Sequence, residues 1–201
     1  MFDNTPVRQQ KFHAALDRLS KPESHFVSFS FFSPDEIASM IADTADLSFR
    51  AATPVVGNNV HQDMEVCFPA PRIASFEACA SLLEDLVCDW PDFDTSIAKP
   101  FALNDFAVQR YGPQSKGIGI HKDGLRYRNL VFIICLDGVS RLFHCQDRQG
   151  HKKIAINDAP GRIVILKAPG FVGFDPDRRV LHGVDRISKG RLSIGFRCEA
   201  S

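Results

Sequence analysis

The chain has 201 residues, of which 44% are hydrophobic and 24% charged, as is usual for a globular domain with a sizeable core. Basic and acidic residues number 24 each, so the formal net charge is zero. This balance excludes the overall basic surface expected of a protein that binds duplex nucleic acid. The sequence also contains no apolar run long enough for a membrane span, no phosphate-binding loop and no G-x-S-x-G nucleophile motif.

The first half of the chain mixes helical and extended patterns. Phe12, Leu16 and Leu19 form one stripe of a helix, and Ser33 and Glu36 have the spacing of a capping box. In chain order, the patterns predict a helix over 5–19, a strand over 25–32, a helix from 34 to about 47, a strand over 60–68, a helix over 73–89 and a loop over 89–100.

From residue 104 onward, short alternating segments are separated by turn signals such as Gly112-Pro113 and Pro160-Gly161. The predicted strands are 104–111, 117–123, 128–136, 140–146, 151–157, 161–167, 179–184 and 190–198. Eight short strands after a helical half predict an α+β fold, a double-stranded β-helix (jelly-roll) barrel with N-terminal helices packed on one sheet. We expect one domain, in which 1–103 provides support and a substrate lid and 104–198 forms the core.

A candidate metal site lies in this second half. His121 and Asp123 are two residues apart, so in a strand both side chains project from the same face. His182 supplies a second imidazole from a distant strand. Two histidines and one carboxylate form the facial triad that binds non-haem Fe(II) and leaves coordination positions open. His61 and Asp63 repeat the His-x-Asp spacing, but no second His followed by Arg-x-Ser accompanies them.

The last predicted strand carries two arginines on one face. Alternation places Arg191, Ser193 and Arg197 opposite the apolar residues Leu192, Ile194 and Phe196. Two guanidiniums on a face otherwise suited to packing indicate a bound anion, and a dicarboxylate such as 2-oxoglutarate would satisfy both.

In this order of motifs, the chain resembles the Fe(II)/2-oxoglutarate-dependent dioxygenases, and its details are most similar to the AlkB-like branch. The resemblance covers about residues 104–198. It implies that His121, Asp123 and His182 bind iron. It also implies roles in binding 2-oxoglutarate: Arg191 with Tyr111 at the distal carboxylate, Arg197 at the carboxylate beside the keto group, and Gln109 and Ser193 as polar support.

Two positions depart from the AlkB-like pattern. Gln109 and Ser193 stand where the pattern has two asparagines, which changes the hydrogen bonds offered to the co-substrate. Leu125 stands where AlkB repair enzymes have a second aspartate that recognises the base. Nucleobase demethylation is therefore a less favoured expectation than another oxidation.

These observations predict a 2-oxoglutarate-dependent non-haem iron dioxygenase, most simply a hydroxylase of a small molecule or an amino-acid-like substrate, consuming O2 and forming succinate and CO2. The alternatives are an AlkB-like oxidative dealkylase of nucleic acid or protein, and a jelly-roll protein that binds metal without catalysis. We expect no nucleic-acid partner and no membrane. With no signal peptide at its start and six cysteines without C-x-x-C spacing, we expect the chain in the cytoplasm.

Overall fold

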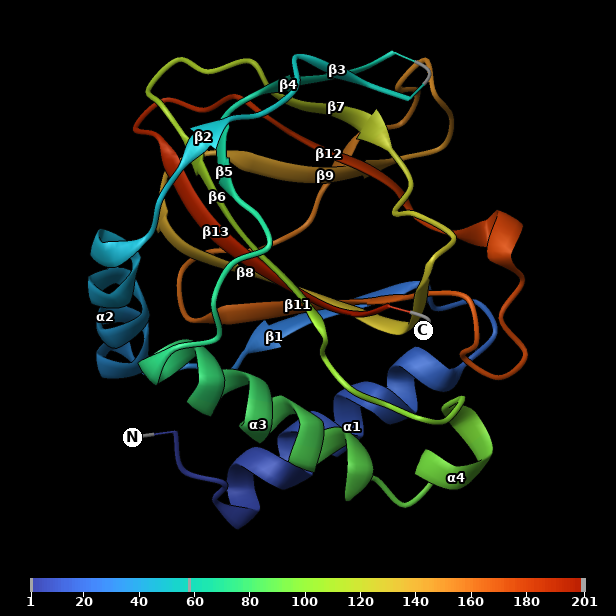
Figure 1. The fold of residues 1–201 in the computed structure, drawn as a ribbon. Helices are drawn as coiled ribbons and strands as arrows, with labels where there is room; N and C mark the ends of the chain where they lie inside the picture. The colour runs from blue at the N-terminus through green and yellow to red at the C-terminus, as the bar shows by residue number, and fades with distance from the viewer. Residues whose placement is uncertain (1, 58, 200–201) are drawn as a thin grey trace.

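In the computed structural model, which describes residues 2–57 and 59–199, two antiparallel sheets face each other and helices cover one of them (Figure 1). The helices are α1 (Pro6–Ser20), α2 (Pro34–Asp43), α3 (Ala74–Cys88) and α4 (Phe93–Ser96), with the 3-10 turns η1 (Thr44–Asp46) and η2 (Pro176–Arg178). The strands are β1 (Phe26–Ser30), β2 (Arg50–Ala51), β3 (Val55–Val56), β4 (Val60–Asp63), β5 (Glu65–Cys67), β6 (Asp105–Tyr111), β7 (Gly117–His121), β8 (Tyr127–Gly138), β9 (Arg141–Cys145), β10 (Ile154–Ala155), β11 (Arg162–Lys167), β12 (Leu181–Asp185) and β13 (Arg191–Glu199).

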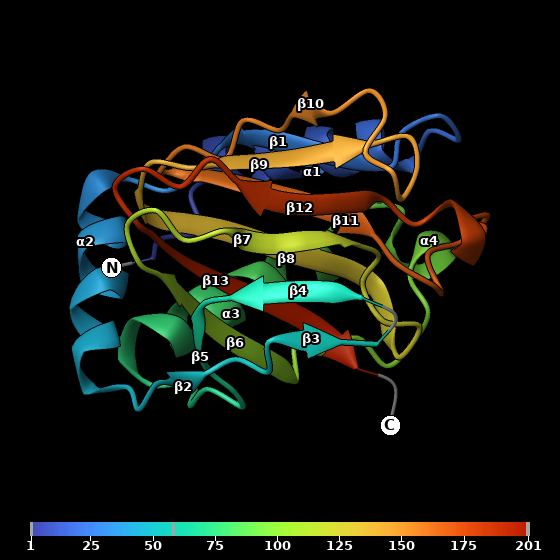
Figure 2. The same cartoon turned by 90° about the horizontal axis from the view of Figure 1, so that it is seen from above.

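The order of the strands is that of a double-stranded β-helix. One sheet has the order β1-β11-β8-β13-β6-β5-β2, and the other has the order β10-β9-β12-β7-β4-β3. From β6 to β13 the chain alternates between the two sheets, except that β9 and β10 pair within the same sheet. Figure 2 shows one sheet in front of the other. The predicted jelly-roll fold is therefore confirmed, and every strand predicted after residue 104 is present.

Alternation in β13 separates two cores. Ile194 and Phe196 point toward α1 and α3 and join the large apolar cluster between the first sheet and the helices. Phe196 stacks on Phe106 of the neighbouring β6 with ring centroids 4.5 Å apart. A second, smaller apolar cluster, which includes Ile118 and Val184, occupies part of the space between the sheets. The predicted helices thus cover one face of one sheet, and the space between the sheets remains for polar side chains of β13.

Several local predictions were wrong. The alternating segment 60–68 is not one strand, because the chain leaves one sheet after β4 and enters the other at β5, with Met64 between them. The helix predicted to reach residue 47 ends at Asp43 and continues as η1, and the predicted loop 89–100 contains α4. Strand β7 ends at His121, so Asp123 lies just past the strand instead of within it.

An ion pair joins the first two helices. Arg8 on α1 donates to both carboxylate oxygens of Glu36 on α2, at 2.7 and 2.6 Å, and Glu36 is only 4% exposed. Glu36 also accepts from the backbone N–H of Ser33 and completes the predicted capping box. Burial by itself would raise the pKa of Glu36, but the bonds from Arg8 and Ser33 outweigh it and hold the pKa below its usual value.

We expect Arg8→Ala to lower the free energy of unfolding at neutral pH by about 3 kcal/mol, because Glu36 would be left buried without its counter-ion. Since the pKa of Glu36 is lowered in the folded protein, this stabilisation is present above the pKa of the unfolded chain and is lost as pH falls through the folded value. Urea denaturation across this pH range measures the difference. Lys11→Ala, on the exposed face of the same helix, is the control and should change stability by less than about 0.5 kcal/mol.

Candidate metal centre

The two histidines of the predicted triad are a cross-strand pair. Strand β12 pairs antiparallel with β7, and the register sets His182 opposite His121. Strand β7 ends and β12 begins at the same end of the barrel, at the right of Figure 1, and η2 shortly precedes β12 in the chain. Asp123 reaches the same place from the segment that follows β7. The three residues therefore converge because β12 pairs with β7 at the point where β7 ends and the chain continues to Asp123.

The donor atoms of the triad are close enough to share an ion. One ligand atom from each of His121, Asp123 and His182 lies within 4.8 Å of the others. His182 Nε2 and Asp123 Oδ2 are 3.7 Å apart, and the two imidazole rings have centroids 4.3 Å apart. The 3.7 Å between His182 Nε2 and Asp123 Oδ2 is within the about 4.2 Å that two bonds of about 2.1 Å to a shared metal can span.

A backbone carbonyl fixes the orientation of each imidazole. The Nδ1 atom of His121 lies 2.9 Å from the carbonyl oxygen of Gly119, and that of His182 lies 3.0 Å from the carbonyl oxygen of Val180. A carbonyl only accepts, so each Nδ1 carries the proton and donates it. Each Nε2 is then left with a free lone pair, which is the usual arrangement of metal-binding histidines. The residues therefore fit a divalent metal.

The charge states also suit a metal. Burial, followed by the neighbouring His182, lowers the pKa of His121 to about 4, so this imidazole is neutral at neutral pH. Burial alone would raise the pKa of Asp123, but His182 and Arg197 outweigh it and keep the pKa below its usual value. The centre thus presents an ionised carboxylate and at least one neutral imidazole.

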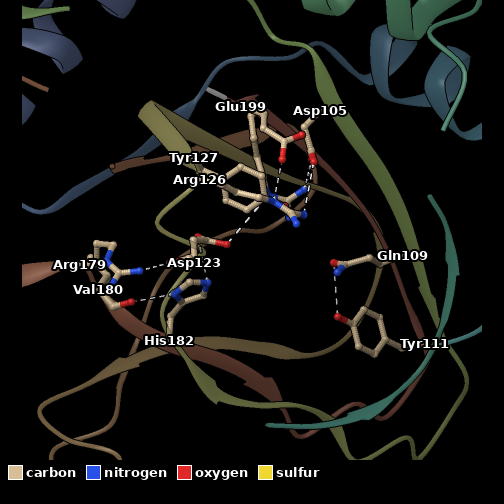
Figure 3. A network of polar contacts seen from close by, with 11 residues as sticks. Asp105, Gln109, Tyr111, Asp123, Arg126, Tyr127, Arg179, Val180, His182 and Glu199 are labelled. Atoms are coloured by element: carbon tan, nitrogen blue, oxygen red, sulfur yellow. Dashed lines mark hydrogen bonds and ion pairs between the residues drawn. The ribbon is translucent and has the colours of Figure 1, made fainter. Parts of the chain in front are cut away.

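Two arginines hold Asp123 from outside the triad. Arg179 donates through Nη1 to the backbone carbonyl of Asp123 (Figure 3). Arg197 Nε lies 4.0 Å from Asp123 Oδ1, while Arg197 Nη1 donates to Asp105 Oδ1 at 3.1 Å. The guanidinium of Arg197 also lies over the ring of Tyr127, 5.1 Å from its centroid. Arg197, which the sequence analysis assigned to the co-substrate, is therefore already engaged by two carboxylates of the chain.

Arg191 lies at the other end of the interior and also has a carboxylate partner. It is 3% exposed, and its Nη1 donates to Asp158 Oδ2 at 2.6 Å and to Ser140 Oγ at 2.9 Å. Its Nε is buried and has no hydrogen-bond partner among the described residues. One edge of the guanidinium is thus held by the protein, and the Nε edge remains for another acceptor.

The remaining predicted site residues come from β6 and β13. Tyr111 donates to Gln109 Oε1 across 3.5 Å (Figure 3), and burial raises the pKa of Tyr111 to about 12, so its hydroxyl stays protonated. Ser193 is buried opposite Gln109 in the β13–β6 register but does not line the central cavity. That cavity, of about 40 Å³, is lined by the triad, both arginines, Gln109, Tyr111, Gly195 and five apolar residues, namely Ile118, Ile133, Leu142, Val184 and Ile194.

Three residues of the site were missed in the sequence analysis, namely Asp105, Asp158 and Arg179. Asp105 could have been found from the strand register. If the last strand pairs antiparallel with residues 104–111 so that Arg191 lies opposite Tyr111, then Arg197 lies opposite Asp105. Asp158 and Arg179 lie outside strands, and no local pattern marks them.

Comparison with solved structures shows which proteins share this fold. A prolyl hydroxylase from Trichoplax adhaerens, in complex with a hypoxia inducible factor peptide fragment, has a TM-score of 0.67 and 13% identity over 96% of this chain and 91% of that chain. HygX from Streptomyces hygroscopicus, with nickel, 2-oxoglutarate and hygromycin B bound, has a TM-score of 0.61 and 11% identity over 92% and 85%. The structure of OsALKBH1 has a TM-score of 0.59 and 16% identity over 87% and 98%.

No protein-family model matches the chain, and no curated protein matches it by sequence. At such low identities the structural likeness establishes the fold, which is that of the 2-oxoglutarate-dependent oxygenases. None of the helices in the described ranges is long and apolar enough to span a membrane.

We expect Asp105→Asn to lower the free energy of unfolding by about 3 kcal/mol or more, because it removes the buried carboxylate that accepts from Arg197 and leaves this guanidinium with only Asp123, 4.0 Å away. Glu199 also binds a guanidinium, that of Arg126, but on the exposed rim. Glu199→Gln is therefore the matched control and should cost less than about 1 kcal/mol. Chemical denaturation of both variants measures the difference, and equal losses would contradict a buried ion pair at Asp105.

Proposed function

We propose that this chain is an Fe(II)- and 2-oxoglutarate-dependent oxygenase. The observation that carries the proposal is the convergence of His121, Asp123 and His182 with both Nε2 atoms free, at the open end of an oxygenase-type barrel. When iron and 2-oxoglutarate are bound, such a centre uses O2 to oxidise a substrate C–H bond while 2-oxoglutarate becomes succinate and CO2. We further propose that the outcome is hydroxylation of a small or amino-acid-like substrate.

In this proposal, the triad holds the metal and Asp123 balances part of its charge. The backbone carbonyls of Gly119 and Val180 keep the imidazoles in the tautomer that binds a metal. Arg179 fixes the backbone of Asp123, so the carboxylate is held in place although it lies outside the strand. Together these contacts build the centre before any ligand arrives, which avoids reorganisation on binding.

Arg191 is the proposed anchor for the distal carboxylate of 2-oxoglutarate. Asp158 and Ser140 occupy Nη1 and thereby fix the rotation of the guanidinium. The unpartnered Nε and the adjacent Nη2 form the edge that binds a carboxylate through two parallel hydrogen bonds. Tyr111 and Gln109 line the same cavity and supply further polar contacts, while its apolar residues exclude water. Arg197 is proposed to meet the carboxylate beside the keto group, and Ser193 is proposed as polar support on the same strand.

Oxidative dealkylation is the second candidate function, because the likeness to OsALKBH1 is nearly as close as that to the prolyl hydroxylase. Leu125, at the position of the base-reading aspartate, is 63% exposed and offers no hydrogen bond. Both reactions form succinate, but only the removal of an alkyl group from nitrogen releases an aldehyde. A substrate screen that measures succinate and aldehyde together therefore distinguishes them.

We expect His121→Ala to weaken Fe(II) binding by more than about 100-fold, since the loss of a ligand should exceed the 10- to 100-fold effect of losing a residue behind a ligand. Anaerobic titration with Fe(II) and measurement of iron content provide the test. His61→Ala is the matched control, because His61 also precedes an aspartate by two residues but is exposed on β4. Wild-type iron binding by the His121 variant would refute the triad.

We expect Arg191→Lys to weaken 2-oxoglutarate binding by about 10- to 100-fold, because lysine keeps the charge beside Asp158 but loses the paired edge. Arg191→Ala alone would leave Asp158 buried without a counter-ion. The Arg191→Ala/Asp158→Ala double variant removes both charges, so it is the better variant for measuring the complete loss of the guanidinium. Affinity and melting temperature are measured on the same samples.

The control for Arg191 is Arg141→Lys, since Arg141 is also paired with a carboxylate, that of Asp185, but does not line the central cavity. Iron binding should survive in all these variants. A lower melting temperature with unchanged 2-oxoglutarate affinity would show that Arg191 serves only the structure.

A further inference from the structure

A second cavity opens beside the metal centre, at the mouth of the barrel. It has a volume of about 480 Å³ and is lined by residues 23–26 at the start of β1, 144–146 at the end of β9, 177–181 from η2 into β12, and Lys122. Lys122 lies between two residues of the triad, and Leu181 directly precedes the third. The mouth cavity and the metal centre are therefore built from the same chain segments.

Three cationic side chains line the mouth cavity, namely Lys122, Arg178 and Arg179. Each of them donates only to uncharged acceptors. Lys122 Nζ donates to the backbone carbonyl of Asp177, and Arg179 donates to those of Pro176 and Asp123. Arg178 Nη2 donates to His25 Nε2 at 3.1 Å. Among residues 2–57 and 59–199, none of the three forms an ion pair with a carboxylate, so their charges are not neutralised.

A fourth cation lies behind this cavity. Lys167 is buried, donates through Nζ to the carbonyl of Lys21 at 2.9 Å and lies 5.2 Å from the ring centroid of Phe171. Lysine is rarely buried without a carboxylate partner. Burial lowers the pKa of Lys167, and Arg178 lowers it further, as expected where positive charges gather.

His25 takes part in the same arrangement. Because its Nε2 accepts from Arg178, the proton of a neutral ring is on Nδ1, and Nδ1 is buried without a partner. Burial, Arg178 and Lys167 all lower the pKa of His25, which keeps it an acceptor. Two acidic side chains, Glu23 and Asp177, also line the cavity, but both are exposed and neither forms an ion pair with a described residue. Glu23 opposes the lowering of the pKa of Lys167 without cancelling it.

The arginines inside the barrel are different. Arg191 has Asp158 as its partner and Arg197 has Asp105, so the charge of each is balanced by the protein. Within residues 2–57 and 59–199, the mouth cavity is where several cations that form no ion pair line a space large enough for a ligand. Lys122 and Arg179 are half-buried and Arg178 is exposed at the rim. Positive charge that the protein does not neutralise is favourable when a ligand supplies the anion.

We propose that the mouth cavity binds an anionic group of the substrate, a carboxylate or a phosphate, held chiefly by Arg178 and Arg179 with Lys122. This inference deepens the proposed function and rests on it, since an anion bound here lies next to the metal ligands. The substrate would then be a negatively charged molecule. Side chains of η2 and the start of β12 would determine which substrates bind.

The test uses two simple probes, phenyl phosphate and benzoate, titrated calorimetrically at low ionic strength into anaerobic protein saturated with Fe(II) and 2-oxoglutarate. Saturation keeps the probes from the co-substrate site. We expect at least one probe to bind the wild type with a Kd below about 10 mM and to weaken as salt rises. The probe that binds tells whether phosphate or carboxylate is the favoured group.

Arg178→Glu should weaken that binding by about 10-fold or more, and Arg178→Gln, which removes the charge but retains a donor for His25, should lie between it and the wild type. Arg186→Glu is the matched control, because Arg186 is exposed in the turn between β12 and β13, at the far end of the barrel. It should bind the probe as the wild type does. Failure of both probes to bind the wild type, or unchanged binding by both Arg178 variants, would overturn the proposal.

Iron content and 2-oxoglutarate affinity are measured in parallel and should be unchanged in the Arg178 variants, since Arg178 contacts no residue of the triad. If the wild type bound no iron, the proposed function would fail. Titration of the metal-free protein with the same probes would then still decide whether the cavity binds anions.

Discussion

The pairing of β12 with β7 determines where the chemistry of this protein lies. It sets His182 opposite His121 and brings two imidazoles, 61 residues apart in the chain, to a ring separation of 4.3 Å. The same pairing brings the segment before β12 close to the end of β7, so that Arg179 reaches the backbone of Asp123. A shift of one residue in this register would turn one of the two histidines to the outer face of the sheet.

Neutralisation of charge is the second constraint on the interior. A guanidinium inside a barrel is costly unless an acceptor compensates it, and the chain provides Asp158 for Arg191 and Asp105 for Arg197. These acceptors also orient the arginines. Arg191 keeps one edge toward the cavity because its other edge is held, and Arg197 is positioned between Asp105 and the carboxylate of Asp123. The buried charges thus arrange the polar site as well as balancing one another.

The two ends of the barrel therefore differ in a way that suits the proposed oxygenase. The deep end holds the free Nε edge of Arg191 in a narrow cavity that is lined by both polar and apolar side chains. The mouth is wider and carries cations without carboxylates, as expected for a ligand that brings its own negative charge. The metal ligands lie between these two environments. Binding of co-substrate and of substrate would thus depend on separate side chains, which allows each to be altered alone.

The sequence by itself determined the elements whose signals are local. Alternation and turn residues predicted all eight strands from β6 to β13, and they placed Leu192, Ile194 and Phe196 on the face that packs against the helices. The capping box predicted the start of α2. Histidine and aspartate at the right spacing predicted the triad, because metal-binding residue types stand out against an otherwise ordinary composition.

Only the tertiary structure decided the partners of these residues. The pairing of Arg191 with Asp158, the position of Asp123 beyond β7, and the division of residues 60–68 between two sheets all depend on strand register and on how the chain turns at the barrel corners. The mouth cavity depends on the meeting of η2, β1 and β9, which are far apart in the chain. Such contacts arise from long-range packing, and no local periodicity or spacing carries information about them.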